Sequence, residues 1–304
     1  MIIVVGEGML ELSGGADARV SGWALGYGGD TLNSAVHLAR LGQRVAFVTA
    51  LGTDPFSESL RRDWTDEGLD LTLARRDPDR RPALYAITTD AQGERSFTYW
   101  RSDSAARRMF ALRDNDDVLA AAGEADLLYF SMISLAILPP EGRDAVFALC
   151  ARIRERGGRV AFDSNYRAAL WESDAVARAV HARAVAVADI GLPTREDEQA
   201  LTGLDDAVAI DAWWRDRGVG EVVVKLGGEG CFADGAVRPV PAKIVPVDTT
   251  GAGDAFNAGY LHARLNGGSI ADSVAAGHVL AGYVIGRRGG IPAASHDAPY
   301  ATLA

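Results

Sequence analysis

The sequence predicts an α/β protein with a doubly wound, mostly parallel central sheet flanked by helices. Short apolar runs alternate along the chain with segments of helical periodicity. The apolar runs are nearly continuous, which is typical of strands buried on both faces of a parallel sheet. No repeat or low-complexity tract interrupts the alternation, so we expect a single domain over residues 1–304.

Strands are expected where Val, Ile, Leu and aromatic residues cluster. These segments are IIVV (2–5), VAFVTA (45–50), ADLLYFSM (125–132), RVAFD (159–163), AVADIGLP (186–193) and EVVVKLG (221–227). Helices are expected between them, where apolar residues recur at helical spacing and glycine often follows. These are DTLNSAVHLARLG (30–42), AVFALCARIRERGG (145–158), EDEQALTG (196–203) and AIDAWWRDRG (209–218).

Two segments depart from this alternation. ALYAITTDAQGERSFTYWRS (83–102) has the pattern of two strands around a turn at Gly93, and ELSGGADARVSGWALGYGG (11–29) is glycine-rich with short β-like pieces. We expect a small sheet that projects from the core and is built from segments of about 10–27 and 82–103. Period-two alternation places Phe97, Tyr99 and Arg101 on one face of it.

Composition argues against several classes of function. The net charge of −10 disfavours nucleic acid as a partner, because phosphates require basic patches. No 18-residue apolar run is present to span a membrane, and the start lacks the basic region of a signal peptide. Cys150 and Cys231 fit a reducing compartment. A cytoplasmic protein without nucleic-acid or membrane partners is the simplest interpretation.

One stretch, DTTGAGDAFNAGYL (248–261), indicates chemistry. Gly251, Ala252 and Gly253 directly precede Asp254, where a helical pattern begins. The start of a helix offers free N–H groups and positive dipole, and small residues let a phosphate approach them. We expect Asp254 to stay ionised near that dipole and to accept a proton from a sugar hydroxyl. A glycine turn with a simple helix cap is the structural alternative.

Two other nucleotide-binding motifs are absent from the sequence. A Walker loop requires Gly-Lys-Ser/Thr, and the chain has no Gly-Lys pair. The dinucleotide fingerprint requires G-x-G-x-x-G, but GAGDAF and GYGGDT place Phe256 and Thr31 at the third glycine. Hydride transfer is therefore disfavoured, and the motif favours phosphoryl transfer.

The same stretch closely resembles the C-terminal signature of the PfkB (ribokinase-like) carbohydrate kinases. GGDTLNSAVHLARLG (28–42) resembles their N-terminal Gly-Gly motif, and the order of strands and helices also agrees over essentially the whole chain. The resemblance implies a ribokinase-like fold, ATP and Mg²⁺ as cofactors, and a small-sheet lid over the sugar. It implies that Asp254 is the catalytic base and forms an anion hole with Gly251, Ala252 and Gly253.

Within that family, the chain most resembles the kinases of 2-keto-3-deoxygluconate. The similar segments are GGDTLNSAVHLARLG, ALYAI, YWRSDSAAR and DSNYRAALW. This resemblance implies transfer of phosphate to the terminal hydroxyl of that sugar acid, giving the 6-phosphate. Arg101, beside Tyr99, suits a buried substrate carboxylate, and Tyr85 on the partner strand adds a hydroxyl or an apolar wall. A kinase of a neutral ketose such as fructose, and a non-catalytic sugar-binding regulatory relative, are the alternatives.

Further site residues follow from these segments. Arg167, in DSNYRAALW (163–171), resembles an arginine that approaches the substrate and the transferred phosphate; a surface salt bridge is the alternative. Asp163 and Asn165 are expected to shape the same loop. For the sugar site, the residues at the start of the early helix are Gly28, Gly29, Asp30 and Asn33. For the nucleotide site, VVVKLGGEG (222–230) offers Lys225, Gly227 and Gly230.

The magnesium ligands stay unassigned. Many members of the family carry Asn-x-x-Glu after a strand, whereas LPTREDE (192–198) has Thr194 and Asp197 at that spacing, with Glu198 adjacent. GRRGGIP (286–292) resembles the family's late loop near the adenine and a monovalent cation. The resemblance also implies a homo-oligomer, although no single residue of this sequence decides it.

Overall fold

The computed structural model describes residues 1–14, 22–89, 95–112 and 115–304. Within them the larger sheet has eight strands. In spatial order these are β14 (Ala236–Arg238), β13 (Cys231–Ala233), β12 (Glu221–Lys225), β11 (Ile190–Gly191), β10 (Arg159–Asp163), β9 (Leu127–Ser131), β1 (Ile2–Val5) and β4 (Val45–Val48). The strands from β4 to β12 pair in parallel, and β13 and β14 add an antiparallel edge. The predicted fold class is confirmed.

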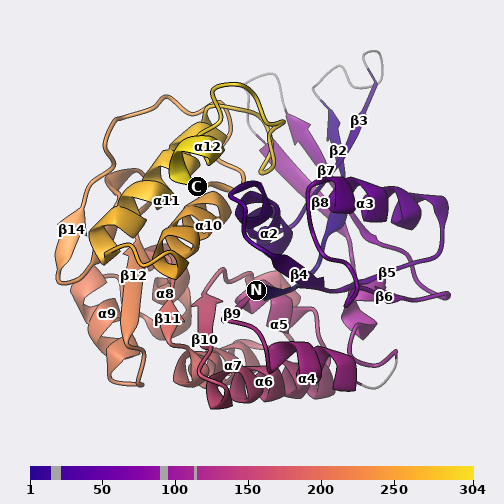
Figure 1. The fold of residues 1–304 in the computed structure, drawn as a ribbon, viewed down its shortest axis with the longest axis horizontal. Coiled ribbons are helices and arrows are strands. Elements are labelled where there is room, and N and C mark those ends of the chain that lie inside the picture. Colours follow the sequence, from indigo (N-terminus) through magenta and orange to yellow (C-terminus); the bar gives the residue numbers. More distant parts are fainter. Residues whose placement is uncertain (15–21, 90–94, 113–114) are drawn as a thin grey trace.

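Helices cover both faces of this sheet (Figure 1). One layer consists of α2 (Asp30–Arg40), α10 (Ala252–Leu265) and α11 (Ile270–Ile285), with α12 (Tyr300–Leu303) beside them. The other contains α4 (Asp116–Ala122), α5 (Met132–Ala136), α6 (Pro140–Glu155), α7 (Asp174–Val187), α8 (Arg195–Thr202) and α9 (Ala207–Arg215). Helix α3 (Pro55–Asp66) lies beyond the β4 edge, close to the small sheet.

The strands divide their side chains between two cores. In β1, Ile2 and Val4 pack under α2 and α10, whereas Ile3 and Val5 pack against the opposite helix layer. Because successive residues of a strand point to opposite faces, a continuous apolar run supplies both cores. This double burial holds the carboxyl ends of the strands in a fixed row, and open α/β sheets bind their ligands at that edge.

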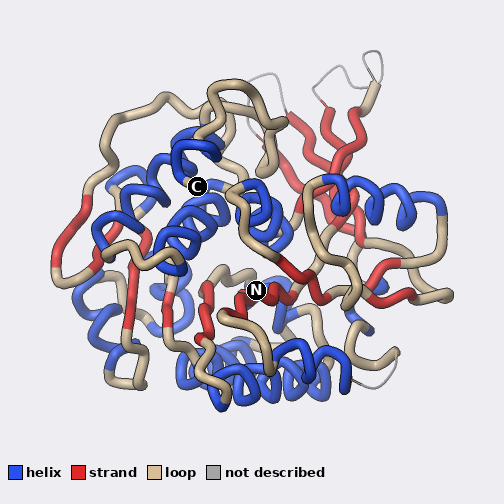
Figure 2. Tube along the Cα trace, in the orientation of Figure 1, coloured by secondary structure: helices blue, strands red, loops and turns tan. Residues whose placement is uncertain are grey.

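A second sheet projects from the core (Figure 2). Its strands, in order, are β3 (Ala24–Gly28), β2 (Met9–Gly14), β7 (Ala83–Thr89) and β8 (Arg95–Trp100), and we call it the small sheet. The β2–β7 pair is parallel and the outer pairs are antiparallel. The turn expected at Gly93 lies outside the described residues. A further pair joins β5 (Ala50–Leu51) to β6 (Arg75–Arg76).

The helix starts fall into two kinds. Asp54 caps α3, Ser173 caps α7 and Ser269 caps α11 with side-chain oxygens that accept backbone N–H groups. Helices α2 and α10 begin instead at Gly29 and Gly251, with no side-chain cap among the described residues. The two helices that carry the sequence signatures therefore begin without the side-chain cap that α3, α7 and α11 have.

Two segments differ from the sequence-based expectation. The run at 186–193 forms only the two-residue strand β11, because helix α7 continues to Val187 and occupies the start of that run. The short antiparallel strands β13 and β14 were not predicted. A short run beside a glycine-rich turn carries little periodic signal, and its pairing with β12 is a tertiary contact.

Close packing of α10 on α11 positions the signature helix. An added Cβ at Gly259 would lie 2.7 Å from the carbonyl oxygen of Ala276. We expect Gly259→Ala to lower the free energy of unfolding by about 1–3 kcal/mol through overpacking. Gly26→Ala, where nothing lies within 4 Å of the new Cβ, is the control. Chemical denaturation of both variants measures this, and equal stabilities would refute the packing account.

Candidate active site

Two cavities meet at the start of α10. The acidic cavity, of about 880 Å³, lies between the small sheet and the first turns of α2 and α10, and Asp30, Asp163, Asp197 and Asp254 line it. The apolar cavity, of about 900 Å³, lies between α11 and the chain that follows β14. Both are lined by Lys225, Gly227, Thr249, Ala252 and Gly253. A molecule that fills both cavities therefore passes over the first turn of α10.

Backbone geometry keeps that first turn open. Gly251 has φ +72°, and a Cβ there would lie 2.6 Å from the Cα of Gly290. The glycine is thus required by its conformation and by a close backbone contact, in addition to any need for phosphate access. A Cβ on Gly253 would meet nothing nearer than the Lys225 Nζ at 3.7 Å.

Most amides of this turn are available to a ligand. Among the described residues the N–H groups of Gly251, Gly253 and Asp254 have no partner, whereas that of Ala252 donates to the carbonyl oxygen of Thr249 at 3.3 Å. Free N–H groups at a helix start form an anion site. The N–H groups of Gly253 and Asp254 are therefore better candidates for the predicted anion hole than that of Ala252, which already donates a hydrogen bond.

Asp254 lies in this turn and lines the acidic cavity, and its side chain is almost wholly buried. Its Oδ2 accepts a hydrogen bond from Asn33 Nδ2 at 2.7 Å. Burial and the nearby carboxylate of Asp30 raise the pKa of Asp254 to about 8. Burial and like charge therefore favour the protonated carboxyl in the ligand-free protein, against the expectation that Asp254 stays ionised near the helix dipole.

Further hydrogen-bonded polar groups line the acidic cavity with Asp254. Lys225 Nζ donates to Asp163 Oδ1 at 2.9 Å, and Asn257 Nδ2 donates to Asp163 Oδ2 at 2.8 Å. Asp30 accepts hydrogen bonds from Ser131 and Asn165, and burial raises its pKa. Lys225, predicted near the nucleotide phosphates, is thus anchored between the two cavities.

The two glycines before α2 are explained by packing. A Cβ on Gly28 would lie 2.4 Å from the Tyr85 hydroxyl, and one on Gly29 would lie 2.2 Å from the carbonyl oxygen of Glu7. They allow the small sheet and the β1 turn to approach α2 closely. Gly29, Asp30 and Asn33 line the acidic cavity, whereas Gly28 lies behind Tyr85 and outside the lining. Direct contact between Gly28 and a sugar is therefore not supported.

The small sheet supplies one wall of the acidic cavity. Tyr85 and Tyr99 are cross-strand neighbours with ring centroids 5.9 Å apart, and with Phe97 and Arg101 they line the cavity as the alternation predicts. The sequence predicts that Arg101 binds a substrate carboxylate. Its guanidinium already forms an ion pair with the buried Glu7, at 2.6 Å between Nη2 and Oε2.

Arg167 and Asp197 lie on the opposite wall. Arg167 follows β10, has an exposed side chain and lies 3.6 Å from the Asp197 carboxylate. It lines the cavity, and its ion-pair partner Asp197 belongs to helix α8. Burial and Asp163 raise the pKa of Asp197 to about 7. Thr194 also lines the cavity, whereas Glu198 points into the protein interior and contacts His181.

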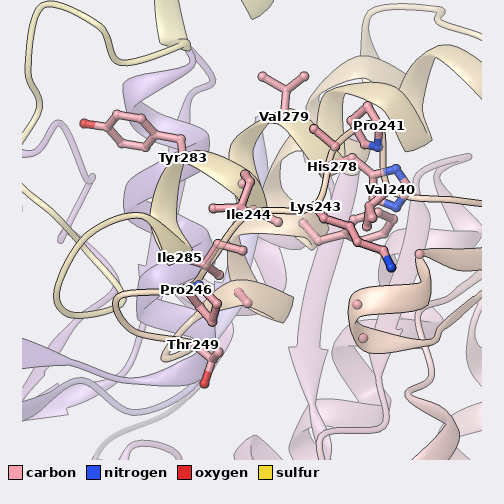
Figure 3. A pocket seen from close by; sticks show the side chains of 18 of the residues that line it. Val240, Pro241, Lys243, Ile244, Pro246, Thr249, His278, Val279, Tyr283 and Ile285 are labelled. Atoms are coloured by element: carbon pink, nitrogen blue, oxygen red, sulfur yellow. The ribbon is translucent and has the colours of Figure 1, made fainter. Parts of the chain in front are cut away.

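Aliphatic side chains line much of the apolar cavity, among them Val240, Ile244 and Val279 (Figure 3). Its polar lining includes His278 and Lys243. Gly227 (φ +58°) faces both cavities, and Gly230 (φ +107°) permits close contact with the carbonyl oxygen of Arg238. Sequence reasoning did not find this wall, because residues 239–251 carry no periodic pattern.

Sequence reasoning also missed Glu7 and Asn257. Glu7 lies in VGEGML (5–10) and Asn257 lies three residues after Asp254, but the periodicity of these segments does not distinguish a site residue from a core residue. No group of three or more His, Cys, Asp or Glu residues disposed to hold a metal occurs in the described parts of the chain. Across those same parts, every helix is too short or too polar to span a lipid bilayer.

A family model described as "pfkB family carbohydrate kinase" matches residues 1–297. The chain belongs to the pfkB family. Among its relatives, the 2-dehydro-3-deoxygluconokinase of Escherichia coli (strain K12) is 42% identical over 302 residues, covering 95% of this chain and 96% of that protein. A fructokinase of Klebsiella pneumoniae is 33% identical, covering 90% and 87%.

A solved structure is also similar to this chain. It is the aminoimidazole riboside kinase of Salmonella enterica, complexed with aminoimidazole riboside and an ATP analogue. Its TM-score is 0.83 at 26% identity, covering 100% of this chain and 99% of that one. The match extends over both cavities and the small sheet of this pfkB chain.

The raised pKa of Asp254 predicts a pH-dependent stability. The folded protein holds this proton up to about pH 8, whereas the unfolded chain releases it near the ordinary value of 3.8. Folding therefore loses stability as the pH rises through this window, and Asp254→Asn removes the loss. We expect the Tm advantage of Asp254→Asn over the ligand-free parent to grow between about pH 5 and about pH 8.

Thermal unfolding at both pH values measures this difference. Asp216→Asn, at the exposed end of α9, is the control and is expected to give a pH-independent Tm difference. A Tm difference for Asp254→Asn that is the same at both pH values would contradict the raised pKa.

Proposed function

We propose that this pfkB chain is an ATP-dependent kinase that phosphorylates the terminal hydroxyl of 2-keto-3-deoxygluconate (2-dehydro-3-deoxygluconate) to its 6-phosphate. One observation carries the proposal: free helix amides and the Asp254 carboxyl lie together where the two cavities meet. The relative at 42% identity, named for this reaction, supports the choice of substrate. The enzyme would work in the cytoplasm, where ATP is supplied.

The geometry divides the ligands between the cavities. The adenine would lie against Ile244 and Val279 in the apolar cavity, with its phosphates directed toward Gly227 and Lys225. The sugar acid would occupy the acidic cavity beneath Tyr85 and Tyr99. The terminal phosphate and the acceptor hydroxyl then meet at the first turn of α10, which is the arrangement that in-line transfer requires.

The reaction uses three groups of this chain. The acceptor oxygen bonds to the terminal phosphorus while the bond from that phosphorus to the bridging oxygen of ADP breaks. Asp254 takes the hydroxyl proton, and the amides of Gly253 and Asp254 stabilise the charge on the transferring phosphate. Lys225 and Arg167 line the same cavity and add positive charge on either side of it.

Asp254 must be ionised to act as a base. Its pKa of about 8 reflects an acidic cavity without ligand cations, and positive charge brought beside it lowers that value. Mg²⁺ keeps several waters and binds through one or two carboxylates plus substrate phosphates. Asp197 and Asp163 offer such carboxylates at the cavity. The ion would neutralise phosphate charge; its ligands, and the monovalent cation implied for the 286–292 loop, are part of this proposal.

The acidic cavity also bears on substrate choice. Its carboxylates repel an anionic sugar except near Arg101 and Arg167, so the substrate carboxylate is expected on the small-sheet side, at Arg101. A neutral ketose would not need that cation. The fructokinase relative is less similar, at 33% identity.

The outer face of the small sheet exposes Trp23, Leu25 and Trp100, which supports self-association into a homo-oligomer.

Removing the base tests the reaction. We expect Asp254→Asn to fold and to bind ATP while its turnover falls roughly 10²–10⁴-fold, because the hydroxyl proton loses its acceptor. A coupled ADP-release assay across keto-deoxy sugar acids and common hexoses measures both the activity and the substrate. Near-normal turnover of the Asn variant, or an absence of ADP release by the parent chain with every substrate, would contradict the proposal.

Removing the cation tests the substrate class. We expect Arg101→Ala to lower kcat/KM for 2-keto-3-deoxygluconate by roughly tenfold to a hundredfold, because a charge-assisted contact to the carboxylate is lost. Turnover of fructose should change little. Arg76→Ala, in an exposed ion pair with Glu58, is the matched control. Equal losses on the acid and the neutral sugar would favour the ketose alternative.

A further inference from the structure

We infer that Glu7 is a positioning residue for sugar-acid recognition, because its buried carboxylate fixes the guanidinium of Arg101 at the wall of the acidic cavity. This inference rests on the proposed function and assigns a task to a residue that does not line the cavity itself. Glu7 follows β1 in the turn that leads to β2, and its side chain is fully buried.

The side chain of Glu7 contacts Arg101 and Ser104. Its Oε2 accepts a hydrogen bond from Arg101 Nε at 2.9 Å and lies 2.6 Å from Nη2 in an ion pair, while its Oε1 accepts from the Ser104 hydroxyl. Arg101 itself lines the acidic cavity. A charge-assisted hydrogen bond together with this ion pair restrains the position of the planar guanidinium at the cavity wall.

The pair also lies where the chain crosses between the sheets. Glu7 lies between β1 of the larger sheet and β2 of the small sheet, and Arg101 directly follows β8, where the chain leaves the small sheet. An ion pair between these crossings holds the base of the small sheet against the core. Arg101 therefore keeps one position relative to Asp254, which belongs to the core.

Without Glu7, Arg101 has another partner within reach. Asp30 and Arg101 both line the acidic cavity, and burial raises the pKa of Asp30 while the charge of Arg101 partly offsets that rise. A released guanidinium would turn toward Asp30 and neutralise it, and a substrate carboxylate would then have to compete with Asp30 for the same donors. Glu7 thus keeps Arg101 in place and keeps Asp30 available.

A double-mutant cycle tests the inference. We expect Glu7→Gln to raise the KM for 2-keto-3-deoxygluconate roughly tenfold, with a smaller change in kcat and an unchanged KM for ATP. In an Arg101→Ala background, Glu7→Gln should change the KM for the sugar acid no further, because Glu7 acts through Arg101. An equal effect in both backgrounds, or a fall in kcat alone, would overturn the inference.

Glu198→Gln is the matched control. Glu198 is equally buried, contacts His181 and does not line the cavity, so its loss should lower stability and leave the KM for the sugar acid unchanged. If Glu7→Gln does not fold, Glu7→Asp replaces it in the same cycle. The shorter carboxylate withdraws from Arg101 and should raise this KM by a smaller factor, again only where Arg101 is present.

Failure of this inference can be told apart from failure of the proposed function. If the parent chain phosphorylates the sugar acid but the KM does not respond to Glu7→Gln or Glu7→Asp, only the role of Glu7 is wrong. If the parent chain turns over neutral sugars and no sugar acid, the substrate assignment is wrong and the role of Glu7 falls with it.

Discussion

The arrangement of the site depends on negative charge that is buried before any ligand arrives. Asp30, Asp163, Asp197 and Asp254 line one cavity, and Lys225 is the buried cation among them. Burial of so many carboxylates raises the pKa of Asp254 to about 8 and that of Asp197 to about 7. In the proposed reaction, the carboxyl of Asp254 must therefore lose its proton before it can act as the base. Cations that accompany a nucleotide relieve this repulsion, so ligand binding and activation of the base are linked by electrostatics.

Glycines allow the close backbone contacts that surround these buried carboxylates. Gly251 and Gly290 let the backbone before α10 and the late loop touch, and Gly290 in turn packs against the side chain of Asn33, the hydrogen-bond donor to Asp254. Gly29 brings the turn at Glu7 against the start of α2. The starts of α2 and α10, the Asp254 carboxyl and the turn at Glu7 are thus joined through close contacts. A change at any of these glycines would move several site groups together.

The sequence predicted the sheet, the two signature helices and much of the lining of the acidic cavity, because these follow from periodicity and from motifs that are local in the chain. Contacts between residues that are distant in the sequence could not be predicted in this way. The ionisation of Asp254 depends on burial and on Asp30, which lies far from it in the sequence, and the Glu7–Arg101 pair joins residues 94 positions apart in the chain. The assignment of Gly28 to the sugar site failed for the same reason, since only the fold places Tyr85 in front of it. The sequence could not show that Thr194 and Asp197 line the acidic cavity whereas Glu198 contacts His181 in the interior. That difference depends on how the start of helix α8 is oriented in the fold.

The central claim is that the first turn of α10 holds the transferring phosphate while Asp254 receives the proton of the acceptor hydroxyl. A crystal structure with a non-hydrolysable ATP analogue, Mg²⁺ and 2-keto-3-deoxygluconate tests it most directly. The account predicts the terminal phosphate on the amides of Gly253 and Asp254, and the C6 hydroxyl within hydrogen-bonding distance, about 3 Å, of the Asp254 carboxylate. A sugar acid bound with that hydroxyl directed away from Asp254, or a terminal phosphate held elsewhere, would contradict it.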